Sequence, residues 1–315
     1  MQFIVNRNLA KNIVATITYY DVLDYPLTSF EVWKHLIDSQ ASQKAKRYRL
    51  SDVDICLQEV ALKKYISEKN GFYFLCGREK LIKKRKEREI ISLQKIKKLQ
   101  RIVSILRFSP FVRMICVTGR LAYKNCEENS DLDVLVVYKS GHIWTGRFFI
   151  TVLSHVIGVR RYGDKTSDRV CLNYHITTES LSVPTRDLFA AHEYSFIFPL
   201  YDNNNFFEKF CEENMWIQNY KPQYSCEYKK HVLTVGDYFF GMILRSLFEI
   251  IFADKGMENR LRDFQGKKIA NNLNTSLEGA MILYNDRHLV FLPRPHGPEV
   301  FEEYKKRLDA LEIDL

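Results

Sequence analysis

The sequence Val112-Arg-Met-Ile-Cys-Val-Thr-Gly119 is followed, after eleven intervening residues, by Asp131-Leu-Asp-Val-Leu-Val-Val-Tyr138. Two apolar runs of strand length therefore flank a glycine and a polar stretch, and the second run opens with two carboxylates. Alternate residues of a strand point to the same face, so Asp131 and Asp133 are expected to project together while Leu132 and Val134 face the core. Paired carboxylates suit Mg²⁺, which completes its shell with water and substrate phosphates. The pattern favours phosphoryl or nucleotidyl transfer.

This segment resembles the nucleotidyltransferase superfamily that includes DNA polymerase beta and the small antibiotic nucleotidyltransferases. The superfamily signature is a hydrophobic residue, Gly-Ser or Gly-Gly, a spacer of about ten residues, and then alternating acidic and hydrophobic residues. Gly119, the spacer Leu121–Ser130 and Asp131-Leu-Asp-Val134 fit this signature. Arg120 departs from it, because a serine or glycine is usual there. An arginine could bind phosphate through its fork of donors, or it could fill the pocket.

The resemblance implies an enzyme whose substrate is a nucleoside triphosphate and whose cofactor is Mg²⁺ or Mn²⁺. An acceptor hydroxyl would attack the α-phosphorus, and pyrophosphate would leave. Asp131 and Asp133 would hold the metal and act in catalysis. Gly119, Arg120 and Lys124 are the candidate nucleotide-binding residues, since backbone N–H groups at a glycine turn can approach phosphate closely.

The superfamily usually supplies a third carboxylate from a later strand, and the corresponding run here is Val170–Ile176. This run contains no acid. Asn173 is the position that we align with the third carboxylate, and His175 shares its face and could accept a proton near neutral pH. Asp168, just before the run, is the acidic candidate for a catalytic role.

Composition indicates a globular protein of two or three domains. The 315 residues are 46% hydrophobic and 27% charged, values typical of folded domains. Seven cysteines lack a Cys-x-x-Cys pair, which predicts reduced thiols, a cytoplasmic location and no zinc site. Apolar stretches are interrupted by charged residues, so we expect no membrane-spanning segment and no signal peptide.

The net charge of +9 is concentrated in one stretch. From Arg78 to Arg101 the chain has eleven Lys or Arg and three Glu, a net charge of +8. Such a stretch can attract nucleic acid, with Lys83, Lys84 and Arg85 as the candidate contacts. It can equally be the solvated face of an ordinary helix.

The first 78 residues show the pattern of a winged helix. Helical spacing of apolar residues, a Thr28–Glu31 capping box, a third helix from Ser51 to Tyr65 and a hairpin turn at Asn70-Gly71 follow one another. The third helix begins with acidic residues and lacks arginines for guanine edges, so packing or protein contact is favoured over DNA binding. DNA binding would depend on Lys44, Lys46, Arg47 and Arg49.

The expected fold class is α+β: an N-terminal winged helix, a polymerase-beta-like mixed sheet with flanking helices, and a helical C-terminal region. The predicted domains are the winged helix (1–78), a basic connecting helix (79–107), the nucleotidyltransferase core (108–202) and a mainly helical C-terminal domain (203–315). In this order the chain is similar to a group of bacterial and archaeal nucleotidyltransferase-domain proteins.

Three functions are open at this point. The first is nucleotidyl transfer to a small molecule, a protein or a nucleic-acid end. The second, motivated by Arg120 and the acid-free strand 170–176, is a regulator that senses nucleotide without turnover or that binds nucleic acid or protein. The third, motivated by the basic stretch, is a transferase acting on nucleic acid. The sequence names neither the nucleotide nor the acceptor.

Overall fold

The computed structural model describes residues 7–38, 47–226, 233–237 and 239–312. Within these residues it contains eleven α-helices, nine strands and three short 3₁₀ helices. Helices and strands pack into the same hydrophobic cores. The larger sheet is mixed, since it contains both parallel and antiparallel pairs of strands. The α+β class expected from the sequence is confirmed.

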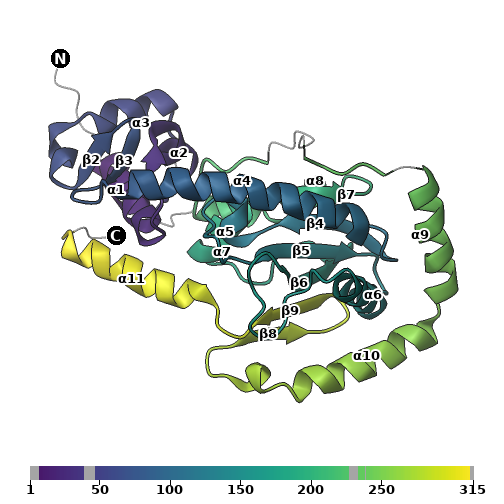
Figure 1. Cartoon of the computed structure of the whole chain (residues 1–315). Coiled ribbons are helices and arrows are strands. Elements are labelled where there is room, and N and C mark those ends of the chain that lie inside the picture. The colour runs from purple at the N-terminus through teal and green to yellow at the C-terminus, as the bar shows by residue number, and fades with distance from the viewer. Residues whose placement is uncertain (1–6, 39–46, 227–232, 238, 313–315) are drawn as a thin grey trace.

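Residues 7–75 form the first module, shown in purple and blue in Figure 1. Its sheet has the order β1-β3-β2 and is antiparallel. The capping box at Thr28 is present: the hydroxyl accepts from the Glu31 N–H, and Glu31 accepts from the Thr28 N–H at 2.8 Å. The expected third helix is shorter than predicted and ends at Leu57, with a separate 3₁₀ turn after it. The elements are α1 (Arg7–Val22), β1 (Leu27–Thr28), α2 (Ser29–Lys34), α3 (Leu50–Leu57), β2 (Ile66–Lys69) and β3 (Phe72–Leu75).

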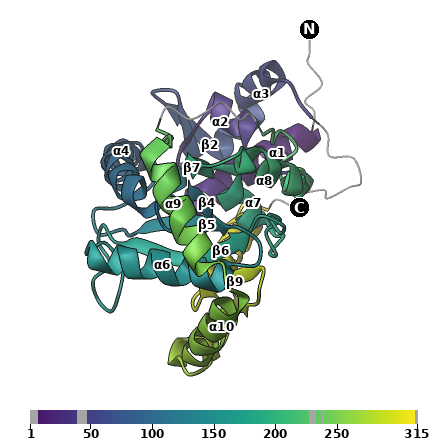
Figure 2. The ribbon, with the colours of Figure 1, turned by 90° about the vertical axis from the view of Figure 1, so that its right-hand side faces the viewer.

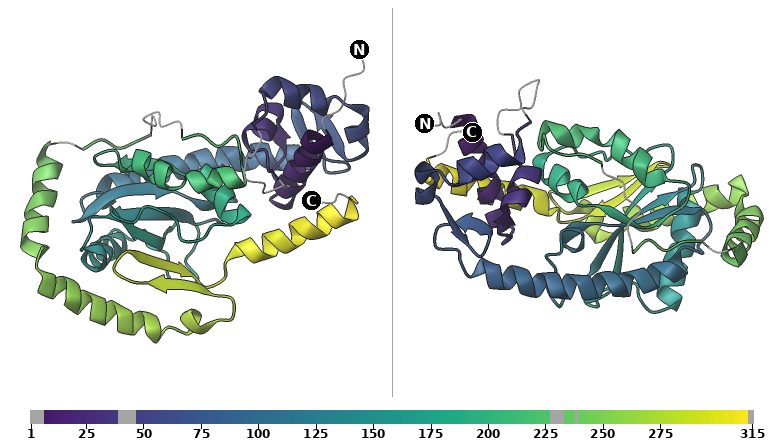
Figure 3. Two further views of the ribbon diagram at one scale, coloured as in Figure 1. Left: turned by 180° about the vertical axis from the view of Figure 1, so that it is seen from behind. Right: turned by 90° about the horizontal axis from the view of Figure 1, so that it is seen from above.

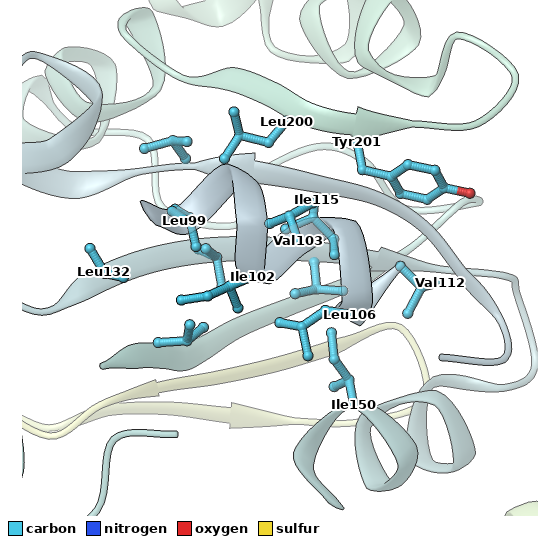
Figure 4. Close-up of a cluster of buried hydrophobic side chains, with 14 of the residues drawn as sticks. Leu99, Ile102, Val103, Leu106, Val112, Ile115, Leu132, Ile150, Leu200 and Tyr201 are labelled. Atoms are coloured by element: carbon cyan, nitrogen blue, oxygen red, sulfur yellow. The ribbon is translucent and has the colours of Figure 1, made fainter. Parts of the chain in front are cut away.

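Helix α4 (Leu81–Leu106) runs from this module along the whole length of the core, as Figure 3 shows from above. Its apolar stripe packs against the large sheet. Figure 4 shows Leu99, Val103 and Leu106 directed at sheet residues such as Ile115. Burying apolar side chains of this size contributes about 1.5–3 kcal/mol each, so the helix is anchored by its second half.

The large sheet has the order β7-β4-β5-β6-β9-β8, and only the pair β5–β6 is parallel. Helices α4 and α6 (Ile143–Val156) cover one face, and α7 (Leu188–Ser195) and α8 (Phe206–Glu213) cover the other. Residues of β5 alternate between the two cores. The strands are β4 (Val112–Val117), β5 (Leu132–Tyr138), β6 (Val170–Thr177), β7 (Phe198–Asp202), β8 (Met281–Tyr284) and β9 (His288–Leu292).

The C-terminal third contributes to both other parts of the molecule. Hairpin β8–β9 joins the large sheet through β6, and α11 (His296–Ala310) packs on α1 with Tyr304 and Leu308 buried. Before the hairpin in the chain, α9 (Phe239–Phe252) and α10 (Lys255–Ala270) curve around the α6 side (Figures 1 and 2). The sequence predicts a helix over His231–Ala253, and residues 231–232 and 238 of this range lie outside the described residues. The domain boundaries from the sequence stay a prediction.

The cysteines correct one expectation. Cys211 and Cys226 form a disulfide, so the prediction that all seven are reduced thiols is wrong for this pair. Sequence spacing could not reveal it, because fifteen positions separate the two residues and the fold of α8 and the following turn brings their Cα atoms to 5.7 Å. Among the described residues, no helix combines the length and apolar character needed to cross a bilayer.

Candidate functional site

The two carboxylates at the start of β5 lie side by side. Leu132 and Val134 are buried in the α4 core, and the alternation of the strand turns Asp131 and Asp133 to the other face. A carboxylate oxygen of each residue and the sulfur of Cys171 lie within 4.8 Å of one another. Cys171 belongs to this cluster because β5 and β6 are parallel and Asp133 pairs with Cys171 in the register.

Gly119 borders the cluster directly. Its φ of +61° is in the left-handed region that favours glycine. A Cβ built on Gly119 would meet Oδ2 of Asp133 at 2.8 Å. The turn is held to β5 by the Thr118 N–H, which donates to the Asp133 carbonyl at 3.1 Å. Only glycine therefore allows the backbone to approach the carboxylate this closely.

The electrostatics of Asp133 differ from those of an ordinary surface carboxylate. Burial and the neighbouring charge of Asp131 raise the pKa of Asp133 to about 7. A hydrogen bond from the Cys171 thiol and the charges of Arg161 and Arg120 oppose this rise. A nearby positive charge favours the ionised form of two acidic groups that otherwise cannot both ionise freely.

In the structure that positive charge is supplied by Arg161. Its Nη1 lies 2.5 Å from Oδ2 of Asp131 and 3.3 Å from the sulfur of Cys171. Burial and the two carboxylates raise the pKa of the Cys171 thiol well above its ordinary value. The thiol is thus a neutral hydrogen-bond donor at neutral pH.

The pairing of β5 with β6 that places Cys171 beside Asp133 does not place Asn173 or His175 beside the carboxylates. The register between β5 and β6 shifts after Cys171, so Tyr174 pairs with Leu135 and strict alternation along β6 is broken. His175 is consequently fully buried toward α6, where Nδ1 lies 2.9 Å from the Tyr138 hydroxyl. Burial lowers its pKa well below the usual range. Asn173 is partly buried and lines a neighbouring pocket.

Asp168 lies outside the cluster formed by the described residues. Its carboxylate accepts from Lys95 at 2.5 Å and from Lys98 at 3.0 Å, which ties the loop before β6 to α4. These hydrogen bonds lower its pKa against the opposing effect of burial. The geometry gives Asp168 a partner on α4, not a place beside Asp131.

Arg120 and Lys124 occupy different surroundings. The Arg120 side chain is exposed, and its charge acts on Asp133. Lys124 is also exposed and lies 3.9 Å from Glu89 of α4. Arg120 is therefore at the carboxylate edge, whereas Lys124 faces α4.

The basic stretch is largely occupied by ion pairs within the molecule. Arg85 is buried, donates to Glu31 at 2.6 Å and 3.0 Å, and stacks on the Tyr25 ring. Lys84 lies 2.5 Å from Asp24. Lys83 remains mostly exposed, 3.8 Å from Glu87. Two of the three predicted nucleic-acid contacts are thus used to hold α4 against the first module.

The DNA contacts expected from the sequence lie in the loop before the third helix. Two of them, Lys44 and Lys46, fall within residues 39–46, which lie outside the described residues. Arg47 donates to the Pro222 carbonyl at 3.1 Å.

Sequence patterns do not assign Cys171 or Arg161 to the site. Helical spacing with Asp187 and His192 offers Glu193 only as a group that could orient metal ligands. Parallel pairing of the strand starts at 132 and 170 would have placed Cys171 opposite Asp133. Arg161 lies in the loop between α6 and β6, and no sequence pattern assigns it to the site. Glu193, on α7, is partly buried, and burial together with the charge of Asp133 raises its pKa to about 8.

Comparison with known proteins does not add to these observations. No family model matches the chain, and no match is found among curated proteins or among solved structures.

Proposed function

We propose that this protein is a metal-dependent nucleotidyltransferase that moves a nucleoside monophosphate from a nucleoside triphosphate to an acceptor hydroxyl. The observation that carries the proposal is the Asp131–Asp133 pair with Gly119 pressed against it. Because Gly119 has no Cβ, the turn lies directly against the Asp133 carboxylate, and its backbone N–H groups would be close to a phosphate tail that a metal ion on the two carboxylates holds. In the reaction, the acceptor oxygen bonds to the α-phosphorus, the bond to the β-phosphate oxygen breaks, pyrophosphate leaves, and the hydroxyl proton passes to a carboxylate or to water.

The donor set fits Mg²⁺ through its two carboxylates. Asp131 and Asp133 are hard oxygen ligands, while the raised pKa of Cys171 keeps its thiol protonated and disfavours it as a ligand. When bound, Mg²⁺ would neutralise charge on the reacting phosphate and lower the barrier to displacement. Arg161 must leave Asp131 to make room, which its largely exposed side chain permits.

In this proposal Arg120 binds phosphate, and Glu193 accepts a proton. Arg120 is exposed beside the turn, which favours phosphate binding over filling the pocket. Glu193 is the further carboxylate electrically coupled to Asp133, and its raised pKa suits a group that accepts a proton near neutrality. Helix α7, which carries Glu193, packs against the helix opened by Gly119, with the Tyr123 and His192 rings 4.7 Å apart.

The surrounding architecture is consistent with this proposal. The order of three helices and a hairpin supports a winged helix for residues 7–75. A mixed sheet with the glycine turn between β4 and β5 supports a polymerase-beta-like core. We assign the winged helix to packing, because its α3 begins with acidic residues and its module shares a core with α11.

The test is binding and transfer of nucleotide with matched variants. Calorimetry with a non-hydrolysable triphosphate should detect binding that requires Mg²⁺ and is lost in Asp131→Asn plus Asp133→Asn. Asp168→Asn is the control, since that carboxylate pairs with Lys95 and Lys98, and it should retain binding. Transfer of labelled nucleotide to an acceptor then measures turnover. Absence of Mg²⁺-dependent binding in the wild-type protein would remove the proposal.

A second candidate, a nucleotide sensor without turnover, is favoured by one observation. Cys171 stands opposite Asp133, and no third carboxylate joins the cluster among the described residues. A sensor would bind triphosphate with Mg²⁺ and respond in its partner contacts, with no transfer. Detecting labelled product would decide for the enzyme.

A further inference from the structure

A pocket of about 380 Å³ adjoins the carboxylate cluster and belongs to no step described above. It lies between the start of β6, hairpin β8–β9, α10 and the loop at Arg160–Gly163. Arg147, Arg160, Arg161 and Lys268 line it, and none of the described lining residues is acidic. Arg161 is paired with Asp131, and the other three cations around a pocket without a lining carboxylate are an excess of positive charge.

Arg147 shows that this excess is built into the fold. Its Nη1 donates to the Gln265 amide oxygen at 2.6 Å, its guanidinium stacks over Phe291 at 4.7 Å, and its Nε is buried without a hydrogen-bond partner. Burial lowers its pKa to about 10. No acidic side chain pairs with it among the described residues. A buried donor without a partner costs free energy unless a ligand satisfies it.

The pocket and the carboxylates share two residues. Arg161 lines the pocket and also pairs with Asp131, and Cys171 is both a wall residue and a member of the cluster. Gly119 and Arg120 are not among the lining residues. The pocket wall of Leu172, Ile269 and Phe291 belongs to the α6 side of the sheet, so the pocket meets the carboxylate edge at the strand starts, through Arg161 and Cys171, and on a side that the proposed triphosphate turn does not occupy.

We propose that this pocket binds the anionic group of the acceptor, and that the acceptor is a small molecule carrying a phosphate or carboxylate as well as the reacting hydroxyl. The volume suits a small molecule, and the Phe291 and Ile282 side chains form an apolar wall. Forked guanidinium groups are the usual partners of such anions. The anion site stands on this geometry alone, while its role as acceptor site rests on the proposed function.

The test uses glycerol 3-phosphate as the probe, with glycerol as its neutral match. Calorimetry on the full-length protein without metal or nucleotide should show binding of the phosphate compound only. Arg160→Gln plus Lys268→Gln should weaken it roughly tenfold or more, because two charged contacts are lost. Lys267→Gln, one residue away on α10 and outside this pocket, should bind as the wild type does. No binding to the wild type, or equal loss in the Lys267 variant, overturns the proposal.

A second titration separates the acceptor from the nucleotide. With Mg²⁺ and a non-hydrolysable triphosphate at saturation, glycerol 3-phosphate should still bind within about twofold. Competition between the two would mean that the pocket holds the phosphates of the nucleotide, and the acceptor assignment would fall. If the triphosphate does not bind while glycerol 3-phosphate does, the proposed function and the acceptor role fail and the anion site stands.

Discussion

Helix α4 and the edge of β5 use charge in opposite ways. Helix α4 lies in the most basic stretch of the chain, yet Arg85, Arg88 and Lys95 are buried and paired with acids of other segments. At the edge of β5 two carboxylates lie side by side, with Arg161 ion-paired to Asp131 and the charge of Arg120 acting on Asp133. The ion pairs of α4 hold this helix against the first module and the core. In the proposed function, the like-charged pair Asp131 and Asp133 binds a metal ion instead.

The difference teaches that charge density does not identify a binding site. In α4, each buried cation has an acidic partner, and the pairing joins the first module to the core. At β5 the chain brings two acids within 4.8 Å of each other, and Arg161 forms an ion pair with Asp131 alone. The following predictions test this contrast, from the largest expected effect to the smallest.

Breaking a satisfied charge should have the largest effect. Arg85→Ala leaves Glu31 partly buried without its partner, so we expect the free energy of unfolding to fall by about 3 kcal/mol. Lys83→Ala, on the same helix but exposed, should change it by less than about 0.5 kcal/mol. Urea unfolding followed by fluorescence measures both. Similar small losses in the two variants would show that Arg85 is not structural.

Crowding the carboxylate edge should have the next largest effect. Gly119→Ala places a Cβ against Asp133 and forces a left-handed residue, which should cost about 1–3 kcal/mol and abolish Mg²⁺ binding. Gly141→Ala is the matched control, because Gly141 also has positive φ but open space around its Cβ position. That variant should lose some stability and keep Mg²⁺ binding. Equal Mg²⁺ affinities in the two variants would contradict the close approach.

The raised pKa of Asp133 predicts a pH dependence of stability. The folded protein keeps the Asp133 proton up to about pH 7, while the unfolded chain releases it near 3.8. The folded state therefore binds more protons in this window, and the free energy of unfolding should fall as the pH rises through it. Asp133→Asn should remove this decline and be relatively more stable at pH 8. Parallel pH profiles for wild type and variant would argue against the raised pKa.

Removing the counter-charge should have the smallest effect. Arg161→Gln frees Asp131 and should raise the Mg²⁺ affinity by at most about fivefold, because the arginine is largely exposed. Lys165→Gln removes a charge from the same loop without a contact to Asp131, and its affinity should stay near that of the wild type. A lower affinity in the Arg161 variant would mean that this arginine helps to assemble the site.

Local patterns predicted the elements well where one rule dominates. The capping box at Thr28, the hairpin turn at Asn70-Gly71 and the strand from Leu132 follow from spacing and turn chemistry. Alternation also predicted that Asp131 and Asp133 share a face. The third helix was predicted too long, since its apolar spacing continues past Leu57 although the backbone changes to a 3₁₀ turn.

The candidate site was only partly predictable for a physical reason. Gly119, Asp131 and Asp133 lie close in the chain, and their arrangement depends on one strand and one turn. The position facing Asp133 depends on the register of β5 with β6, and the shift in that register turned His175 away and left Cys171 in place. Arg161 and Glu193 come from other segments, so no local pattern places either of them beside Asp131 and Asp133.

By itself the sequence determined the two carboxylates on one strand face and the glycine before them, because alternation and backbone freedom are local properties. Tertiary structure decided which charges are available. It paired the basic residues of α4 with distant acids and set Arg161 against Asp131, and it gathered Arg147, Arg160 and Lys268 around one pocket. Partners of a charge are chosen by packing between segments far apart in the chain, and packing is not encoded in any single stretch.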